Sequence, residues 1–426
     1  MLSPAGQGRG GAAPPRGGGG GPLHDGLALH FAAEAGRQKI VELLLQLGAP
    51  AEARDALDRT PLMYAAYRGR AECARCLLAA GGDAGAADRD GSSALMYAAA
   101  SGSRAVISAL VHGGGADLEQ RNSDGFTAAA FAAEAGHTRA LQLLLDLGGD
   151  PAAPSANGSA PLHWAAKGNS PECCQLLLDA GVPADLANHR GVTPLMCVAT
   201  GGGGASGGSA AAGDGEGPGG AGARGGGAAG GSGGAEAVAV ARLLLEAGAD
   251  PRGRDHDGCT VAMYASYSGN VRVLELLFER GAEPFGRNLA GSTCLMYSAY
   301  MGQLGVAHLL LRRFGDRSRE LLGAEDREGM TAMQWAESGG QGRMSAFLEQ
   351  YASGVPLEWG PQAHRHFPGP VRRRAQELLR HASRLPLPRD LVCEITARVV
   401  KSETWWMLEG RGAGGLRPTT CSEAAA

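Results

Sequence analysis

The stretch Thr60-Pro61-Leu62-Met63-Tyr64-Ala65-Ala66 decides the fold, because it returns along the chain. Close copies stand at residues 93–99, 160–166, 193–196 and 293–297. With the position of Pro61 as the marker, nine copies align, at residues 28, 61, 94, 128, 161, 194, 261, 294 and 332. Most steps between neighbouring markers are 33 or 34 residues. A fixed period of this length predicts stacked structural repeats.

A second apolar block completes each copy. Residues 40–45 read Ile-Val-Glu-Leu-Leu-Leu, and triple leucines recur at residues 143–145, 176–178, 243–245 and 309–311. Apolar residues at helical spacing that are soon followed by glycine predict a helix with a left-handed cap. Tetrads of the form Asp/Asn-x-x-Gly separate the copies and predict turns. Each copy therefore predicts a turn, a short helix, a tight loop, a longer helix and a loop.

In the order and spacing of these motifs the chain resembles the ankyrin repeat over about residues 26–350. The resemblance implies an all-α ankyrin-repeat solenoid of stacked helix-turn-helix units with short β-hairpin-like turns. It also implies that the first helices line a concave groove and that the turns project beside it as fingers. The His of the family pattern is kept only at His30 and His163, and five copies have Met. We therefore expect apolar packing to replace the hydrogen bond of that His, and the turns of those copies to be less rigid.

The repeats assign residues 24–350 to the ankyrin-repeat array. A Gly-rich insertion at residues 201–236 interrupts it, and 19 of residues 201–234 are glycine. Because the repeat resumes in register, we favour a disordered loop extruded from an intact stack, with a hinge between two arrays as the alternative. Residues 1–23, also rich in glycine, and residues 409–426 are predicted to be disordered tails.

Residues 351–408 do not follow the repeat and are predicted to form a small C-terminal helical segment. The favoured interpretation is a helical cap, because an open solenoid needs a cover on its last repeat. The alternative is a docking box, since Leu-Pro-Leu-Pro at residues 385–388 is similar to a string in the SOCS box. Apolar residues at helical spacing after it are similar to the start of an F-box: Leu391, Ile395 and Val399. This resemblance implies a substrate receptor of a cullin-type ubiquitin ligase that docks on a ligase adaptor.

Composition and motifs argue against other classes of function. A net charge of −4 does not fit a broad basic face, so nucleic acid is not an expected partner. No apolar run approaches the roughly 18 residues that span a bilayer, so no membrane partner is expected. Cys73 and Cys76 fall on apolar helix positions, as do Cys173 and Cys174, and we expect core thiols there rather than a metal site.

No catalytic triad or phosphate-binding motif emerges, so we expect no enzyme activity and no cofactor. Nine cysteines without a regular framework indicate a reducing compartment. We therefore predict a monomeric cytoplasmic protein, with the nucleus as an alternative location.

Two columns of the aligned copies bear on where a partner binds. The column after the Met or His position is aromatic in eight of nine copies, and this regularity favours a structural role over a binding stripe. The column three residues further on varies, and variation where everything else repeats indicates freedom from packing. A tyrosine in this column is a large anchor with little side-chain entropy to lose on binding.

The favoured function is a scaffold for protein–protein interaction that binds a protein partner through the groove and the finger turns. We predict that the partner contacts Tyr67, Arg68, Tyr267 and Tyr300. Replacing these four residues by alanine is expected to weaken binding without lowering the melting temperature. Further candidates lie in the same column, directly after it, or on a finger: Met301, Glu34, Glu134, Lys167 and Phe126. The alternatives are residues that face solvent without a partner, and a regulatory subunit of an enzyme.

Overall fold

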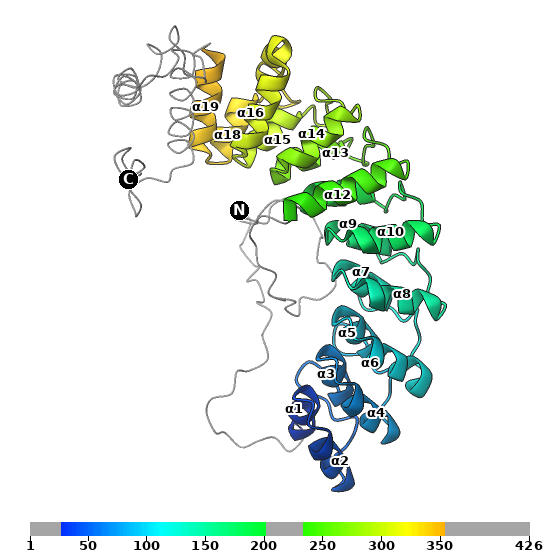
Figure 1. Cartoon of the computed structure of the whole chain (residues 1–426). Helices are drawn as coiled ribbons and strands as arrows, with labels where there is room; N and C mark the ends of the chain where they lie inside the picture. Colours follow the sequence, from blue (N-terminus) through cyan, green and yellow to red (C-terminus); the bar gives the residue numbers. More distant parts are fainter. Residues whose placement is uncertain (1–26, 202–232, 354–426) are drawn as a thin grey trace, which may run out of the picture. The chain divides into compact units, whose positions relative to one another are not determined.

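The computed structural model describes residues 27–201 and 233–353, and its regular structure is helical (Figure 1). No strand occurs in these two ranges. The chain divides into two compact units, Met1–Ala290 and Gly291–Ala426. Each unit is described by itself below.

The described part of the first unit is a stack of helix pairs. The pairs are α1 (Ala28–Glu34) with α2 (Gln38–Gln46), α3 (Pro61–Tyr67) with α4 (Ala71–Ala79), α5 (Ala94–Ala100) with α6 (Arg104–Ser108) and the π-helical η1 (Ala109–Gly113), α7 (Ala128–Glu134) with α8 (Thr138–Asp146), α9 (Pro161–Lys167) with α10 (Pro171–Asp179), α11 (Pro194–Gly201) with α12 (Gly233–Glu246), and α13 (Val261–Ser268) with α14 (Val271–Glu279). First helices pack on first helices, and second helices on second helices. We call these the inner and outer layers, because Figure 1 shows the first helices along the concave side of this unit.

Every first helix begins at the marker position taken from the sequence, which confirms the register of the repeat. In three copies the residue before the marker supplies a side-chain cap: Thr60 Oγ1 accepts a hydrogen bond from the backbone N–H of Met63 at 3.4 Å, and Thr260 and Thr293 cap α13 and α15 in the same way. Such a cap satisfies one of the free N–H groups of the first turn, and a proline such as Pro61 directly after it suits helical φ. The local sequence thus sets where each helix starts.

Small length changes are absorbed inside single repeats. The step from 94 to 128 is one residue longer than its neighbours, and the π-helical η1 takes up this residue. A bond from the N–H of Ala116 to the carbonyl of Leu110, at 3.0 Å, closes this wider turn. An insertion therefore does not shift the register of the following copy.

The Gly-rich insertion enters the first unit between α11 and α12, which pack on one another. The sequence had predicted an insertion that ends at residue 236. Instead, α12 begins at Gly233, so residues 233–236 are helical. Ala235 favours this earlier start because alanine has the highest helix propensity. The turns on either side are joined, since the N–H of His256 donates to the carbonyl of Arg190 at 2.9 Å. The predictions for residues 1–23, for the rest of the insertion and for residues 409–426 lie outside the described residues.

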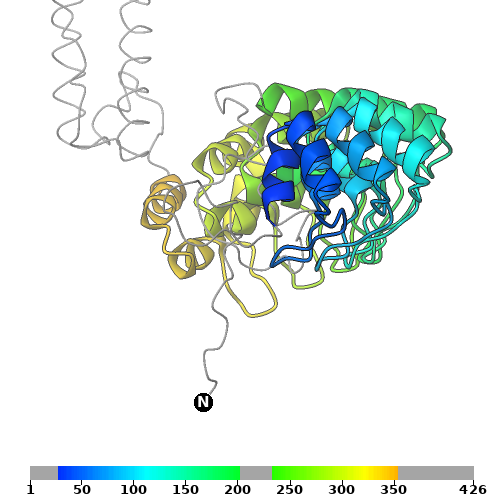
Figure 2. The same cartoon turned by 90° about the horizontal axis from the view of Figure 1, so that it is seen from below.

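The turns of the first unit form a row joined by backbone hydrogen bonds, and Figure 2 shows these loops gathered on one side of the helices. Within single turns, antiparallel bridges such as Ala87 with Ser93 give the predicted hairpin-like shape. Gly125 illustrates how closely the turns approach. Its φ is +78°, and a Cβ there would lie 2.4 Å from the backbone nitrogen of Ala156 in the next turn.

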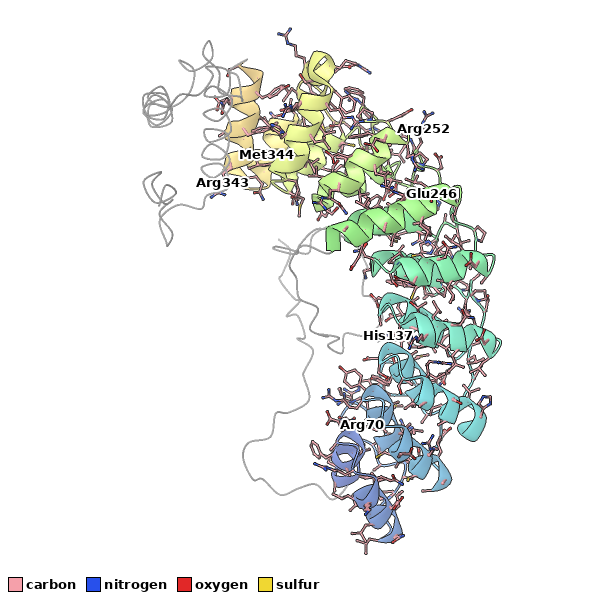
Figure 3. All side chains as sticks on the ribbon, in the orientation of Figure 1. Arg70, His137, Glu246, Arg252, Arg343 and Met344 are labelled. Carbon is pink, nitrogen blue, oxygen red and sulfur yellow. The ribbon has the colours of Figure 1, made fainter. Side chains whose placement is uncertain are left out.

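Side chains also tie the inner layer to the outer layer of the next repeat. Arg70, before α4, donates from Nε to the carbonyl of Glu34 at 3.3 Å. His137, before α8, bonds from Nε2 to the carbonyl of Ala100 at 3.1 Å (Figure 3). Between the layers lies a core of leucine and alanine, and residues such as Leu62 are fully buried. Burying one such leucine stabilises the fold by about 1.5–3 kcal/mol.

The second unit contains two further pairs in its described part: α15 (Cys294–Tyr300) with α16 (Leu304–Arg313), and α18 (Ala332–Ser338) with α19 (Gly342–Ala352). The five extra residues of the last step lie between the pairs, where η2 (Gly315–Arg317) and α17 (Ser318–Leu322) form. Tyr351 Oη donates to the carbonyl of Leu311 at 2.8 Å and fixes α19 against α16. Apart from residues 351–353, the predicted C-terminal segment 351–408 lies outside the described residues.

Candidate protein-binding surface

The Met that replaces the family's His keeps part of its role. Met63 Sδ accepts the N–H of Thr60 at 3.4 Å, and Thr60 caps the helix in return. The same reciprocal pair recurs at the start of α13 and of α15. The thioether, a weak acceptor, thus closes the start of the inner helix.

His163 makes a further bond, which Met cannot make. Its Nδ1 accepts the N–H of Ala160 at 3.1 Å, so Nε2 carries the proton and donates to the carbonyl of Val192 in the next turn at 3.1 Å. His30 reaches the carbonyl of Arg59 in the same way, at 3.0 Å. Burial disfavours a charged imidazole and lowers the pKa of His163 below its usual 6.5.

In three Met copies the aromatic column holds the turn. A tyrosine hydroxyl donates to the aspartate nine residues before it: Tyr64 to Asp55 at 2.8 Å, Tyr97 to Asp88 at 2.6 Å and Tyr264 to Asp255 at 2.7 Å. Burial and this bond raise the pKa of all three phenols, that of Tyr64 to about 12. In these three copies the hydroxyl ties the turn to its own helix. The expected lower rigidity of the turns in the Met copies stays a prediction. In these three copies the tyrosine has a structural role.

Three of the predicted contact residues meet where α1 and α3 adjoin. Arg68 donates to Glu34 Oε1 from Nη2 at 2.7 Å and from Nε at 3.1 Å. Its guanidinium carbon lies 5.4 Å from the ring centroid of Tyr67, which makes an edge contact with Tyr97. The Arg68 side chain is still 46% exposed. We call Glu34, Tyr67 and Arg68 the Arg68 cluster.

A similar group lies where α7 and α9 adjoin. Lys167 Nζ lies 3.6 Å from Glu134 Oε1 and 4.9 Å from the ring centroid of Trp164. Burial raises the pKa of Glu134, and Lys167 opposes that shift. We call Glu134, Trp164 and Lys167 the Lys167 cluster. Both clusters place a partly exposed cation beside an aromatic ring and a carboxylate of the preceding repeat.

The predicted exposure of Phe126 is wrong. Only 2% of this residue is exposed, and its ring centroid lies 4.7 Å from that of Trp164 and 6.2 Å from that of Phe131. The turn directs the ring inward onto the aromatic column. Phe126 therefore packs against Trp164 of the Lys167 cluster and presents almost no surface to a partner.

The remaining predicted contacts are divided between the two units. Tyr267 is half-buried on α13 of the first unit. Tyr300 and Met301 end α15 of the second unit and are also half-buried, and the ring centroid of Tyr300 lies 5.9 Å from that of Trp335. The structure thus brings together Glu34 with Tyr67 and Arg68, Glu134 with Lys167, and Tyr300 with Met301.

Sequence reasoning missed the contribution of the aromatic column to this surface. Trp164 was assigned to the packing column, but its ring also lies beside Lys167. The signal was present, because residues three apart on a helix are neighbours on its surface. The two columns are therefore adjacent along every inner helix.

The structure offers no metal site in its described part, where no group of three His, Cys, Asp or Glu side chains converges. Cys73, Cys173 and Cys174 are buried in the core, and Cys76 is half-buried. Burial raises the pKa of the Cys73 and Cys76 thiols, which disfavours the reactive thiolate. Within the described ranges, no helix is both long and apolar enough to span a membrane.

Comparison with known proteins agrees with this geometry. The family model for ankyrin repeats (3 copies) matches residues 29–122, 62–154, 130–204 and 232–319, which together cover more than half of the chain. No curated protein matches the chain. The matches end before α18, so the predicted number of nine repeats stays a prediction. The helix pairs, their hairpin-like turns and this match together show that the chain belongs to the ankyrin-repeat family.

Proposed function

We propose that the chain is a protein-interaction scaffold whose partner lies across the inner layer of helices. Ankyrin repeats are general modules of protein–protein interaction, and the finer assignment depends on the Arg68 cluster. Arg68 is partly exposed, yet it is held by Glu34 and lies beside Tyr67. A side chain that is already ordered loses less entropy on binding. Arginine and tyrosine are also the residue types most enriched at binding hot spots.

The Lys167 cluster supports the same surface further along the first unit. It has the same composition as the Arg68 cluster and lies on the same layer of helices. A partner that contacts both clusters would lie along the stack and touch successive inner helices. Tyr267 extends the proposed surface within the first unit, and Tyr300 and Met301 are separate candidate contacts on the second unit. All three are half-buried.

The experiment compares the proteins captured by the full chain with those captured by a Tyr67→Ala/Arg68→Ala variant. The matched control is Glu72→Ala/Arg75→Ala, which removes an exposed ion pair from the outer helix α4. We expect specific proteins to fall at least about tenfold with the inner variant, as for a hot spot, and to stay with the control.

Both variants are expected to melt within a few degrees of the wild type, because exposed ion pairs contribute about 0–1 kcal/mol. Equal recovery by the wild type and the inner variant would refute the proposed surface. A large loss of melting temperature in the inner variant alone would assign these residues to stability instead. Adding Tyr267→Ala and Tyr300→Ala then tests whether both units contribute to binding.

The ligase-receptor alternative depends on residues 385–399, which lie outside the described residues. It therefore stays a prediction from sequence. Capture by the full chain, compared with a chain that ends at residue 353 and so keeps α19 and Tyr351, tests it. Recovery of a cullin-ligase adaptor that is lost on truncation would support this alternative, and capture of other proteins without an adaptor would oppose it.

A further inference from the structure

The first repeat exposes a row of large apolar side chains on α2. Ile40 is 48% exposed, Leu43 54% and Leu47 75%. The spacings of three and four residues place the three side chains on one face of the helix, as in a short coiled-coil seam. We call these three residues the α2 stripe.

The position of Ile40 is a core position in every other described repeat of the first unit. Its counterparts are each 1% exposed or less: Cys73, Val106, Ala140, Cys173, Val240 and Val273. In those repeats the outer helices of neighbouring pairs pack on each other, as α4 packs on α2. The position of Ile40 is therefore an interface between outer helices that no described residue covers in the first repeat. Leu43 and Leu47 continue the exposed apolar row along the same face. A helix resembling an outer helix of this protein fits it best.

The residues that precede the first helix are poorly suited to cover the stripe. Residues 1–26 contain Met1, Leu2 and Leu23 as their only large apolar side chains, and glycine and proline dominate the rest. Glycine and proline are also the two residues least compatible with a helix. A second chain, in contrast, carries the same stripe on the same helix.

We propose that the α2 stripe is the contact between two copies of this chain, with α2 lying antiparallel to α2 of the second copy across a two-fold axis. In this arrangement Leu43 meets its own counterpart near the axis, and Ile40 lies opposite Leu47. A two-fold contact uses the same patch on both copies, so it requires a self-complementary surface. The regular apolar row meets that requirement.

The charges around α2 favour the antiparallel orientation. Arg37 and Lys39 are exposed at the start of the helix. At the end of the helix the last carbonyl groups accept the N–H groups of residues 47–49. Glu52 follows a few residues later, and its carboxylate accepts the N–H of Asp83 at 2.8 Å. The carbonyl end of a helix is the negative end of its dipole. Antiparallel helices therefore place basic residues over a negative end, whereas parallel helices would bring like charges together.

Self-association through α2 goes beyond the proposed function and does not depend on it. The α2 stripe belongs to the outer layer, whereas the Arg68 cluster belongs to the inner layer. The sequence had predicted a monomer, since the repeat pattern alone does not reveal which copy lacks a neighbour. The proposal replaces that prediction.

Sedimentation equilibrium of the full chain over about 1 to 100 µM tests the proposal, because this range detects micromolar dissociation constants. For the wild type we expect the mass to rise from 43.3 kDa towards twice that value. Leu43→Lys is expected to remain at the single-chain mass. The matched control is Leu289→Lys, at a turn residue of the same unit that is 58% exposed, and it should associate like the wild type. A wild type that stays at the single-chain mass throughout, or a Leu43→Lys variant that still associates, would overturn the proposal.

A cysteine at the axis tests the geometry. Leu43→Cys should form a disulfide-linked dimer on mild oxidation, because the antiparallel arrangement brings residue 43 next to its counterpart. Leu289→Cys serves as the control and should stay unlinked. Equal cross-linking of the two variants, or none at residue 43, would overturn the antiparallel contact. Both positions are exposed, so each variant should retain the circular dichroism spectrum of the wild type.

Discussion

The repeats of α3 and of α9 hold their turns in two different ways. In the first, Tyr64 donates to Asp55 within the turn of the same repeat. In the second, His163 donates to the carbonyl of Val192 in the turn of the next repeat, and Ser155 stands where the aspartate would be. One tie therefore stabilises a single repeat, and the other stabilises the contact between two repeats.

The tie within one repeat requires two residues, an aspartate in the turn and an aromatic donor nine residues later. Aspartate at the start of the turn occurs with an aromatic donor nine residues later: Asp55 with Tyr64, Asp88 with Tyr97, Asp255 with Tyr264 and Asp326 with Trp335. Among the turns that begin with asparagine, those at Asn122 and Asn188 have Phe131 and Cys197 in that column, which lack such a donor, whereas the turn at Asn288 has Tyr297. The aspartate and the donor are therefore not always paired, since Trp164 follows Ser155. Because solenoid stability is a sum of repeat and interface terms, the two kinds of tie should be separable by mutation.

The largest expected effect is on the tie between repeats. His163→Ala leaves the N–H of Ala160 and the carbonyl of Val192 without their partner at a buried site and opens a cavity. We expect a loss of about 3 kcal/mol in the free energy of unfolding, measured by urea denaturation of the full chain.

The matched control for this substitution is His163→Met, which imports the residue found in five other copies. Its thioether can accept the N–H of Ala160, as Met63 accepts that of Thr60. It should therefore cost clearly less than His163→Ala. Equal losses would show that the helix cap contributes nothing and that only the bond to the next turn counts.

The same tie should make stability depend on pH. The pKa of His163 is lowered in the folded state, so the unfolded chain binds its proton more readily. The contribution of His163 is therefore complete above about pH 6.5 and is lost as the pH falls below that value. By pH 5 the loss is at most about 2 kcal/mol. Urea denaturation between pH 5 and 7.5 should show a steeper acid decline for the wild type than for His163→Met, and parallel curves would contradict this assignment.

Much of the fold could be predicted from the sequence because the repeat unit is defined locally. Turn tetrads, capping residues and glycine stops all lie within one 33-residue copy, and each first helix begins at its marker. What failed was local detail that depends on side-chain direction. Phe126 was expected to be exposed because it lies on a finger, but the turn directs its ring onto Trp164.

The aligned repeats could predict which positions of the candidate surface are partly exposed, but not which side chains contact each other there. The variable column identified Tyr67 and Lys167 as partly exposed, and both are half-buried on inner helices. The bond between Arg68 and Glu34 joins residues 34 positions apart, and no local pattern encodes it. The exposed α2 stripe was also missed, because its sequence reads like any other outer helix.

The tie within one repeat predicts a smaller effect. Tyr97→Phe removes the hydroxyl that donates to Asp88 and leaves the ring in place. We expect a loss of about 1.5–2 kcal/mol in urea denaturation, at the lower end of the range for a hydrogen bond to a charged group. Asp88→Asn in the same background completes a double-mutant cycle, because Asn122 shows that asparagine can hold the turn. A coupling energy near zero would contradict a tie between the two side chains.

The smallest expected effect is a gain. Trp164 Nε1 is buried and has no hydrogen-bond partner among the described residues, whereas Trp335 Nε1 donates to Asp326 at 2.8 Å. Ser155→Asp places a carboxylate at the position equivalent to Asp326, nine residues before the indole. It also removes the hydroxyl that bonds Asn157 Oδ1 and the carbonyl of Ser159, which keeps the net gain small. We expect a gain of about 0.5–1 kcal/mol in urea denaturation, because a buried donor without a partner is destabilising.

The control for this gain is Ser155→Asp in a Trp164→Phe background, where no donor remains and the gain should vanish. A gain that persists there would have to come from the backbone of the turn, since Asp326 also accepts the N–H groups of Glu328 and Met330. If the gain vanishes in that background, it depends on the bond between the new carboxylate and the indole. One substitution would then have added a tie within the repeat to a copy in which His163 already provides a tie to the next repeat. The two ties would then be independent contributions to the stability of this solenoid.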